Sequence, residues 1–261
     1  MTTLNIKNPF NAPVYHEKTI SSTMDISKQL ASAGEAHGTV ITADFQEAGR
    51  GRIKGRTWEM EKEMSLPLTI LLRYPRIEDI PPLLTLRTGL AVSLAIEDFA
   101  PSLKNAVRIK WPNDIMIGSQ KAAGILCEAT GGVHAGGNVH LGIGINISQK
   151  EFPVHLAEKA VSIALAAGKD ITFNERYSLL EKILIRLYDE LETAANNKAL
   201  IARLDQRLYK KGEQVVFIEG AADSGKTVKG CLTGIGDGGE LLIESFDNKK
   251  LYSFITGELI Y

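Results

Sequence analysis

The stretch TVITADFQEAGRGRIKGRTW, residues 39–58, leads from a β-rich run directly into a basic loop. The β-branched residues of 39–45 predict a strand that ends where the polar, glycine-containing segment 46–57 begins. Within that segment, residues 49–56 hold four cations and three glycines and no acid. Glycines let backbone N–H groups approach phosphate oxygens, and guanidinium groups bind such oxygens in pairs. The loop is therefore a candidate anion site, although by itself it fits a solvated basic loop or a nonspecific nucleic-acid patch equally well.

The segments on both sides of this loop alternate between strands and helices. Ser22 or Thr23 caps a short predicted helix, and residues 83–99 carry leucines at helical spacing. Thr172 and Glu175 fit a capping box that opens another long amphipathic helix. Strands are predicted over 66–72, 107–111, 123–129 and 139–147, the last two forming a hairpin around the connection 130–137. We therefore expect an α/β (α+β) fold with a mixed β-sheet and helices on one side.

The pattern changes near residue 209, where helical periodicity gives way to short β-like runs separated by turns. These runs cover 214–218, 227–232, 241–244, 251–254 and 258–260. We expect a first domain over 1–208 and a small SH3-like β-barrel over 209–261. The run GAADSGKT, residues 220–227, fits the phosphate-loop pattern, but a phosphate loop opens a helix and the following residues predict a strand. We interpret it as a turn of the small domain.

Composition limits the classes of function. The 261 residues include 30 basic and 31 acidic ones, which argues against binding nucleic acid or an anionic membrane over the whole surface. The sequence shows no signal-peptide-like start and no long uninterrupted apolar run, so we expect a cytoplasmic location. Cys127 and Cys231 lack a CxxC partner, which predicts buried free thiols rather than a disulfide or a zinc site. No helix-turn-helix pattern supports DNA binding.

Four motifs, in their order along the chain, resemble those of biotin protein ligases. They are QEAGRGR with GRTW (46–52 and 55–58), KWPND (110–114), KAAGIL (121–126) and GIGIN (142–146). The small C-terminal β domain also resembles that of the family, in the form that lacks an N-terminal DNA-binding domain. The resemblance implies that ATP, with Mg²⁺, activates biotin as biotinyl-5′-AMP, and that biotin is then transferred to a lysine of a biotin carboxyl carrier protein or domain. It allows a homodimer and implies no nucleic-acid or membrane partner.

The resemblance also assigns roles to individual residues. Lys121, Arg52 and Asp114 are the expected catalytic residues, and Asp114 is the candidate Mg²⁺ ligand or a hydrogen-bond partner of the incoming lysine. Biotin-binding residues are expected at Ser22, Thr23, Gln46, Arg50, Gly51, Arg52, Lys121 and Gly124. ATP-binding or adenylate-binding residues are expected at Arg50, Arg52, Arg56, Trp58, Lys110, Asn113 and Asn146.

Such a reaction needs cations and positioning rather than a protein nucleophile. A carboxylate with a pKa near about 4 to 5 is already ionised at pH 7, so the obstacle is bringing two anions together and stabilising charge on phosphate oxygens. Ser22 and Thr23 resemble the start of the family's S-T-N segment, but Met24 replaces the amide with an apolar thioether. Two alternatives therefore stay open: a lipoate or octanoate ligase of the same superfamily, and a noncatalytic biotin-sensing module.

Overall fold

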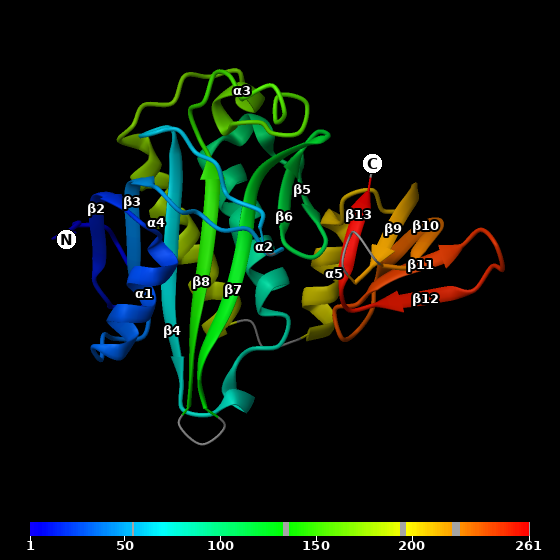
Figure 1. Ribbon diagram of the computed structural model, residues 1–261, viewed down its shortest axis with the longest axis horizontal. Coiled ribbons are helices and arrows are strands. Elements are labelled where there is room, and N and C mark those ends of the chain that lie inside the picture. Colours follow the sequence, from blue (N-terminus) through cyan, green and yellow to red (C-terminus); the bar gives the residue numbers. More distant parts are fainter. Residues whose placement is uncertain (54, 133–135, 194–196, 221–224, 261) are drawn as a thin grey trace.

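A mixed eight-stranded sheet forms the centre of the molecule (Figure 1). The computed structural model describes residues 1–53, 55–132, 136–193, 197–220 and 225–260. Across the sheet the strands are β1 (Thr2–Thr3), β2 (Val14–Ile20), β3 (Thr39–Gln46), β4 (Ser65–Tyr74), β8 (Gly136–Asn146), β7 (Gln120–Gly132), β6 (Asp114–Ile117) and β5 (Val107–Lys110). β2 and β3 pair in parallel, whereas the other neighbours are antiparallel. The prediction of a mixed sheet is confirmed.

The helices lie on both faces of this sheet. They are α1 (Thr23–Ser32), α2 (Leu84–Phe99), α3 (Ile163–Ala167), α4 (Glu175–Tyr188) and α5 (Asn197–Arg207), with shorter helical turns η1 (Ile77–Asp79), η2 (Pro101–Leu103) and η3 (Asp189–Thr193). α2 and α4 pack together on the face where Leu66, Leu68 and Ile70 of β4 are fully buried. Neighbouring residues of a strand point to opposite faces, and His140 of β8 pairs with Leu71, the neighbour of Ile70. His140 therefore points to the other face, where it forms a hydrogen bond with Ser27 of α1. The prediction that the helices lie on one side therefore holds for α2 and α4 and is wrong for α1, which lies on the other face.

The helix α2 occupies the middle of the core. Together with the residues before it, the segment Ile77–Phe99 is long and apolar enough to cross a membrane, but 61% of its most apolar window is buried inside the protein. Its apolar residues contact α4 and strands β5 to β7. The helix α2 within this segment is therefore the core helix of this fold.

The chain after α5 forms a separate antiparallel sheet, seen at the right of Figure 1. Its strands, in spatial order, are β12 (Leu251–Phe254), β11 (Leu241–Ser245), β10 (Thr227–Ile235), β9 (Gln214–Glu219) and β13 (Gly257–Ile260). All five predicted β-like runs fall within these strands, and we propose the domain boundary between residues 208 and 209. In the GAADSGKT run, residues 221–224 lie outside the described part, and Thr227 begins a strand rather than a helix.

Smaller expectations also meet the structure. β7 and β8 form the predicted hairpin, of which residues 133–135 are not described. Ser22 caps α1 by accepting a hydrogen bond from the Met24 backbone N–H. Cys127 and Cys231 are free thiols, as predicted, but each is only partly buried.

Candidate active site

A cavity opens on the face of the large sheet that carries α1. Its floor includes Gly142 and Gly144 of β8 together with Gly124 of β7. A Cβ at Gly144 would lie 2.6 Å from the Trp58 ring, and one at Gly142 would lie 2.8 Å from Met24 Cε. The glycines of the GIGIN segment therefore give these two side chains the room to lie flat against the strands.

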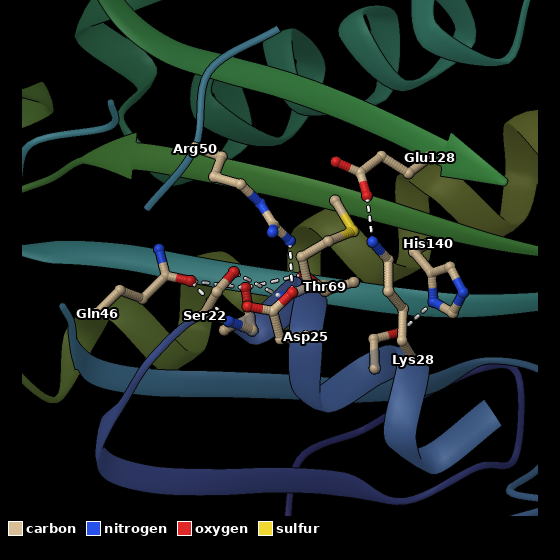
Figure 2. Close-up of polar contacts among 11 residues, drawn as sticks. Ser22, Asp25, Lys28, Gln46, Arg50, Thr69, Glu128 and His140 are labelled. Atoms are coloured by element: carbon tan, nitrogen blue, oxygen red, sulfur yellow. Dashed lines mark hydrogen bonds and ion pairs between the residues drawn. The ribbon is translucent and has the colours of Figure 1, made fainter. Parts of the chain in front are cut away.

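One end of the cavity carries a fixed set of polar groups (Figure 2). Gln46 Oε1 accepts hydrogen bonds from the backbone N–H of Thr23 at 2.8 Å and from its hydroxyl at 2.9 Å. Because a backbone N–H can only donate, the amide oxygen must face Thr23, and the amide NH₂ of Gln46 is turned the other way. Thr69 donates to the Thr23 hydroxyl at 2.8 Å, and Ser22 is buried beside them. This end can therefore donate hydrogen bonds to a carbonyl of a neutral ligand.

The basic loop begins at this cavity and is tied to α1. Arg50 Nη2 donates to a carboxylate oxygen of Asp25 at 2.6 Å, as Figure 2 shows. The loop closes on itself, because the Gly51 N–H donates to the Arg56 carbonyl at 2.8 Å and Arg50 forms an isolated bridge with Thr57. Lys54, one of its four cations, lies outside the described residues.

The other two described arginines of the loop contact the C-terminal sheet. Arg52 Nη2 donates to the Gly257 carbonyl at 3.0 Å. Arg56 forms a bidentate ion pair with Glu258, with N–O distances of 2.7 and 2.8 Å. The hydrogen bond from Arg56 holds the pKa of the Glu258 carboxyl below its usual range, although burial opposes this shift. The loop thus spans the site from α1 to β13.

A second cavity adjoins the first and has a strongly cationic wall. The two cavities share Gly51, Arg52, Trp58, Asn113 and Lys121. The second is further lined by Ile53, Arg56, Thr57, Lys110, Trp111, Pro112, Asp114 and Glu258. The residues shared by both cavities mark a junction where a neutral ligand and an anionic ligand could meet.

Lys121 stands at this junction. Its Nζ lies 2.6 Å from Asp114 Oδ1 and 5.5 Å from the centre of the Trp58 ring. The β6–β7 hairpin brings the two charged residues together. Lys110, nearby on β5, is buried, and burial lowers its pKa while the carboxylates of Asp114 and Glu258 raise it. Lys121, held by its ion pair with Asp114, therefore gives a positioned positive charge.

The structure brings nearly all the predicted site residues to these two cavities. Ser22, Thr23, Gln46, Arg50, Gly51, Arg52, Lys121 and Gly124 line the first, and Arg56, Trp58, Lys110, Asn113 and Asp114 line the second. Asn146 lines neither described cavity. It is 5% exposed, and its amide donates to the backbone oxygens of Lys121 at 3.5 Å and Val161 at 3.4 Å. Asn146 therefore holds the backbone below Lys121.

Several residues of the site were not found from the sequence. Thr69 had a signal, because it is a polar residue inside an apolar strand. Asp25 and Glu258 had none, since neither a partly exposed helix position nor a short C-terminal strand reveals a partner in the basic loop. Within the described ranges, no group of three His, Cys, Asp or Glu side chains could hold a metal ion.

The sequence of this chain matches a known protein family and several of its curated members. The model of the Biotin/lipoate A/B protein ligase family matches residues 17–146. The chain is 33% identical to the bifunctional ligase/repressor BirA of Bacillus subtilis over 247 residues, covering 92% of this chain and 72% of that protein. It is 30% identical to the biotin–[acetyl-CoA-carboxylase] ligase of Paracoccus denitrificans over 215 residues, covering 78% and 82%.

A solved structure supports the same grouping. The biotin protein ligase from Aquifex aeolicus in complex with biotin and ATP has a TM-score of 0.77 and 26% sequence identity with this chain. The alignment covers 95% of this chain and 97% of that one. The likeness therefore includes both the large sheet and the C-terminal antiparallel sheet.

Proposed function

We propose, from the premise that this chain belongs to the biotin protein ligase family, that it is an ATP-dependent biotin–[biotin carboxyl carrier protein] ligase. It activates biotin to biotinyl-5′-AMP and transfers the biotinyl group to a lysine of the carrier. The observation that carries the proposal is the pair of joined cavities, one with a neutral polar end and one with a cationic wall, which share Arg52 and Lys121.

Biotin fits the first cavity with its ureido ring at the polar end. The Gln46 amide NH₂ would donate to the ureido carbonyl, and the Ser22 hydroxyl would accept from a ureido N–H. Met24, 4% exposed and packed on Gly142, supplies an apolar wall in place of the family's amide. The ligand carboxylate would then lie near Arg52 and Lys121.

Activation proceeds by attack of the biotin carboxylate on the α-phosphorus of ATP, which expels pyrophosphate. Arg50, Arg52 and Lys121 lower the repulsion between the two anions and stabilise the negative charge in the transition state. In the second half, the acceptor lysine amine attacks the acyl carbon and AMP leaves. Asp114, at 2.6 Å, keeps the Lys121 ammonium aimed at this junction throughout.

The nucleotide occupies the second cavity in this proposal. Arg56 and Lys110 would contact its phosphates, while Trp58 and Asn113 border the adenylate. Mg²⁺ usually takes one or two carboxylates together with phosphate oxygens and water, so Asp114 fits as a single protein ligand despite its ion pair with Lys121. When bound, Mg²⁺ would neutralise part of the triphosphate charge.

The acceptor, the location and the partners of the enzyme are also proposed from its membership of the family. A biotin carboxyl carrier protein or domain is the acceptor, the location is cytoplasmic, and neither nucleic acid nor membrane is a partner. The nearly balanced charge of the chain supports the last two points. A homodimer is a further proposal that the family resemblance allows.

Biotin-dependent exchange of labelled pyrophosphate into ATP tests the proposal. The expected result is rapid exchange with biotin and little with lipoate or octanoate. Exchange with lipoate or octanoate and none with biotin would assign the chain to the alternative ligase class. Tight biotin binding without any exchange would instead identify a noncatalytic biotin sensor.

A further inference from the structure

The C-terminal sheet is locked to the KWPND segment beside the nucleotide cavity. Trp111 Nε1 donates to the Gly239 carbonyl at 2.9 Å, and the Trp111 ring lies 6.0 Å from the ring of Phe217. Both side chains are buried. Gly257, with a φ of +143°, packs so closely that a Cβ would lie 2.3 Å from the Phe217 ring. The first residues of β13 are therefore held at a defined place next to the cavity.

From that place, β13 holds two successive arginines of the basic loop. The Gly257 carbonyl accepts from Arg52, and the Glu258 carboxylate accepts from both terminal nitrogens of Arg56. The Arg56 side chain is 53% exposed, whereas that of Glu258 is 19% exposed and lines the cavity wall. A fork of this kind fixes the plane of a guanidinium group as well as its position.

This contact serves orientation more than stability. An ion pair with one partner half-exposed contributes little to folding, because water screens the attraction and ordering a long side chain opposes it. The loop's own backbone contacts fix its turn but not its arginine side chains, and an unoriented arginine would have to lose rotamer freedom each time a phosphate bound. Holding the guanidinium in advance removes that part of the cost.

Resting on the proposed ligase function, we propose that Glu258 is a positioning residue for ATP. It orients Arg56 toward the triphosphate, while the Gly257 carbonyl holds Arg52 at the junction of the two cavities. The C-terminal sheet thereby acts as the fixed support of the nucleotide end of the basic loop. The opposing view is that the carboxylate competes with phosphate for Arg56, and it predicts the opposite change in ATP affinity.

Glu258→Gln separates these views, since it keeps the size of the side chain and removes the charge and the symmetric fork. We expect the KM for ATP in pyrophosphate exchange to rise about five- to tenfold, with the KM for biotin unchanged within about twofold. Glu258→Asp, which keeps the carboxylate, should recover part of the loss. Asp98→Asn is the matched control, because it removes a comparable pair with Arg186, at 2.7 Å, and neither residue lines either cavity.

Calorimetric binding of a nonhydrolysable ATP analogue to the same variants measures the effect without catalysis. A five- to tenfold weaker affinity in Glu258→Gln, with a Tm no lower than that of Asp98→Asn, supports the proposal. Unchanged or tighter binding of the analogue overturns it, and so does a parallel loss of biotin and nucleotide affinity together with a large fall in Tm. Absence of exchange by the wild-type protein would reject the ligase function, whereas the binding comparison would still decide the role of Glu258.

Discussion

Lys121 Nζ lies 2.6 Å from Asp114 Oδ1 at the junction of two cavities, one lined by the Thr23–Gln46 pair and the other by Arg56 of the basic loop. The β6–β7 hairpin fixes this distance, and Asn146 holds the backbone oxygen of Lys121 from below. Asp114 therefore acts as the orienting partner of the cation on which the proposed acyl-adenylate chemistry depends.

Lys121→Ala should reduce adenylate formation by about 100-fold or more, the loss seen when a charge-stabilising donor is removed from a transition state. Single-turnover formation of biotinyl-5′-AMP measures it. Lys150→Ala is the control, because Lys150 is an exposed lysine paired with Asp170 at 3.2 Å and lines neither of the two site cavities. Wild-type rates in Lys121→Ala would remove this residue from the site.

Gln46→Glu tests the direction of the amide at the polar end. The new carboxylate can still accept both hydrogen bonds from Thr23, so the local fold should persist. The group that faces the ligand changes from an amide NH₂, which donates, to a carboxylate oxygen, which only accepts. The ureido carbonyl of biotin would then lose its hydrogen-bond donor and face a negative charge. We expect biotin affinity to fall by about 30- to 100-fold, measured by calorimetry. Gln214→Glu, at an exposed position of β9, controls for added charge.

Gly144→Ala should displace Trp58. The added methyl group would lie 2.6 Å from the indole ring, which is rigid and must move away from the floor of the cavity. We predict a loss of about tenfold in kcat/KM for ATP and little change in Tm, since Trp58 belongs to a surface loop. Gly137→Ala, where the nearest atom is 3.4 Å away, is the control on the same strand. Equal kinetics in the two variants would contradict this view of the glycine floor.

Stability should fall in acid through His140. This residue is fully buried between Ser27 and Thr130, and burial lowers its pKa to about 4. Between pH 4 and about 6.5, His140 is protonated in the unfolded chain but stays neutral in the folded chain. The free energy of unfolding therefore decreases as the pH falls.

The slope from His140 alone is at most about 1.4 kcal/mol per pH unit. His140→Gln, which keeps hydrogen-bonding capacity without titrating, should flatten the curve of unfolding free energy against pH in that window. Denaturant unfolding from pH 4 to pH 7 is the measurement. Identical curves for the two proteins would show that another group causes any acid destabilisation.

The sequence was most informative where function requires a local pattern. The basic loop could be predicted as an anion site from its own charges and glycines, whereas KWPND and Lys121 were assigned by their resemblance to the segments of biotin protein ligases. Strands 39–45 and 66–72 were recognisable because β-branched and apolar residues fill them, and the structure has them as parts of β3 and β4.

Contacts between distant segments could not be predicted in this way. The ion pair of Arg56 with Glu258 joins residues about two hundred positions apart, and the docking of Trp111 on the C-terminal sheet helps to bring them together. The position of α1 opposite α2 was missed for a similar reason. Periodicity shows which stripe of a helix is buried, but it does not show which face of the sheet receives it.

Transfer of biotin to an acceptor tests the central claim most directly. The purified chain is incubated with ATP, Mg²⁺, biotin and a biotin carboxyl carrier domain, and the domain is analysed by intact mass and by peptide mapping. The account predicts a mass increase of one biotinyl group on a single lysine, lost when that lysine is replaced by arginine or when ATP is omitted. An acceptor that stays unmodified while an established biotin protein ligase modifies it under the same conditions would contradict the account.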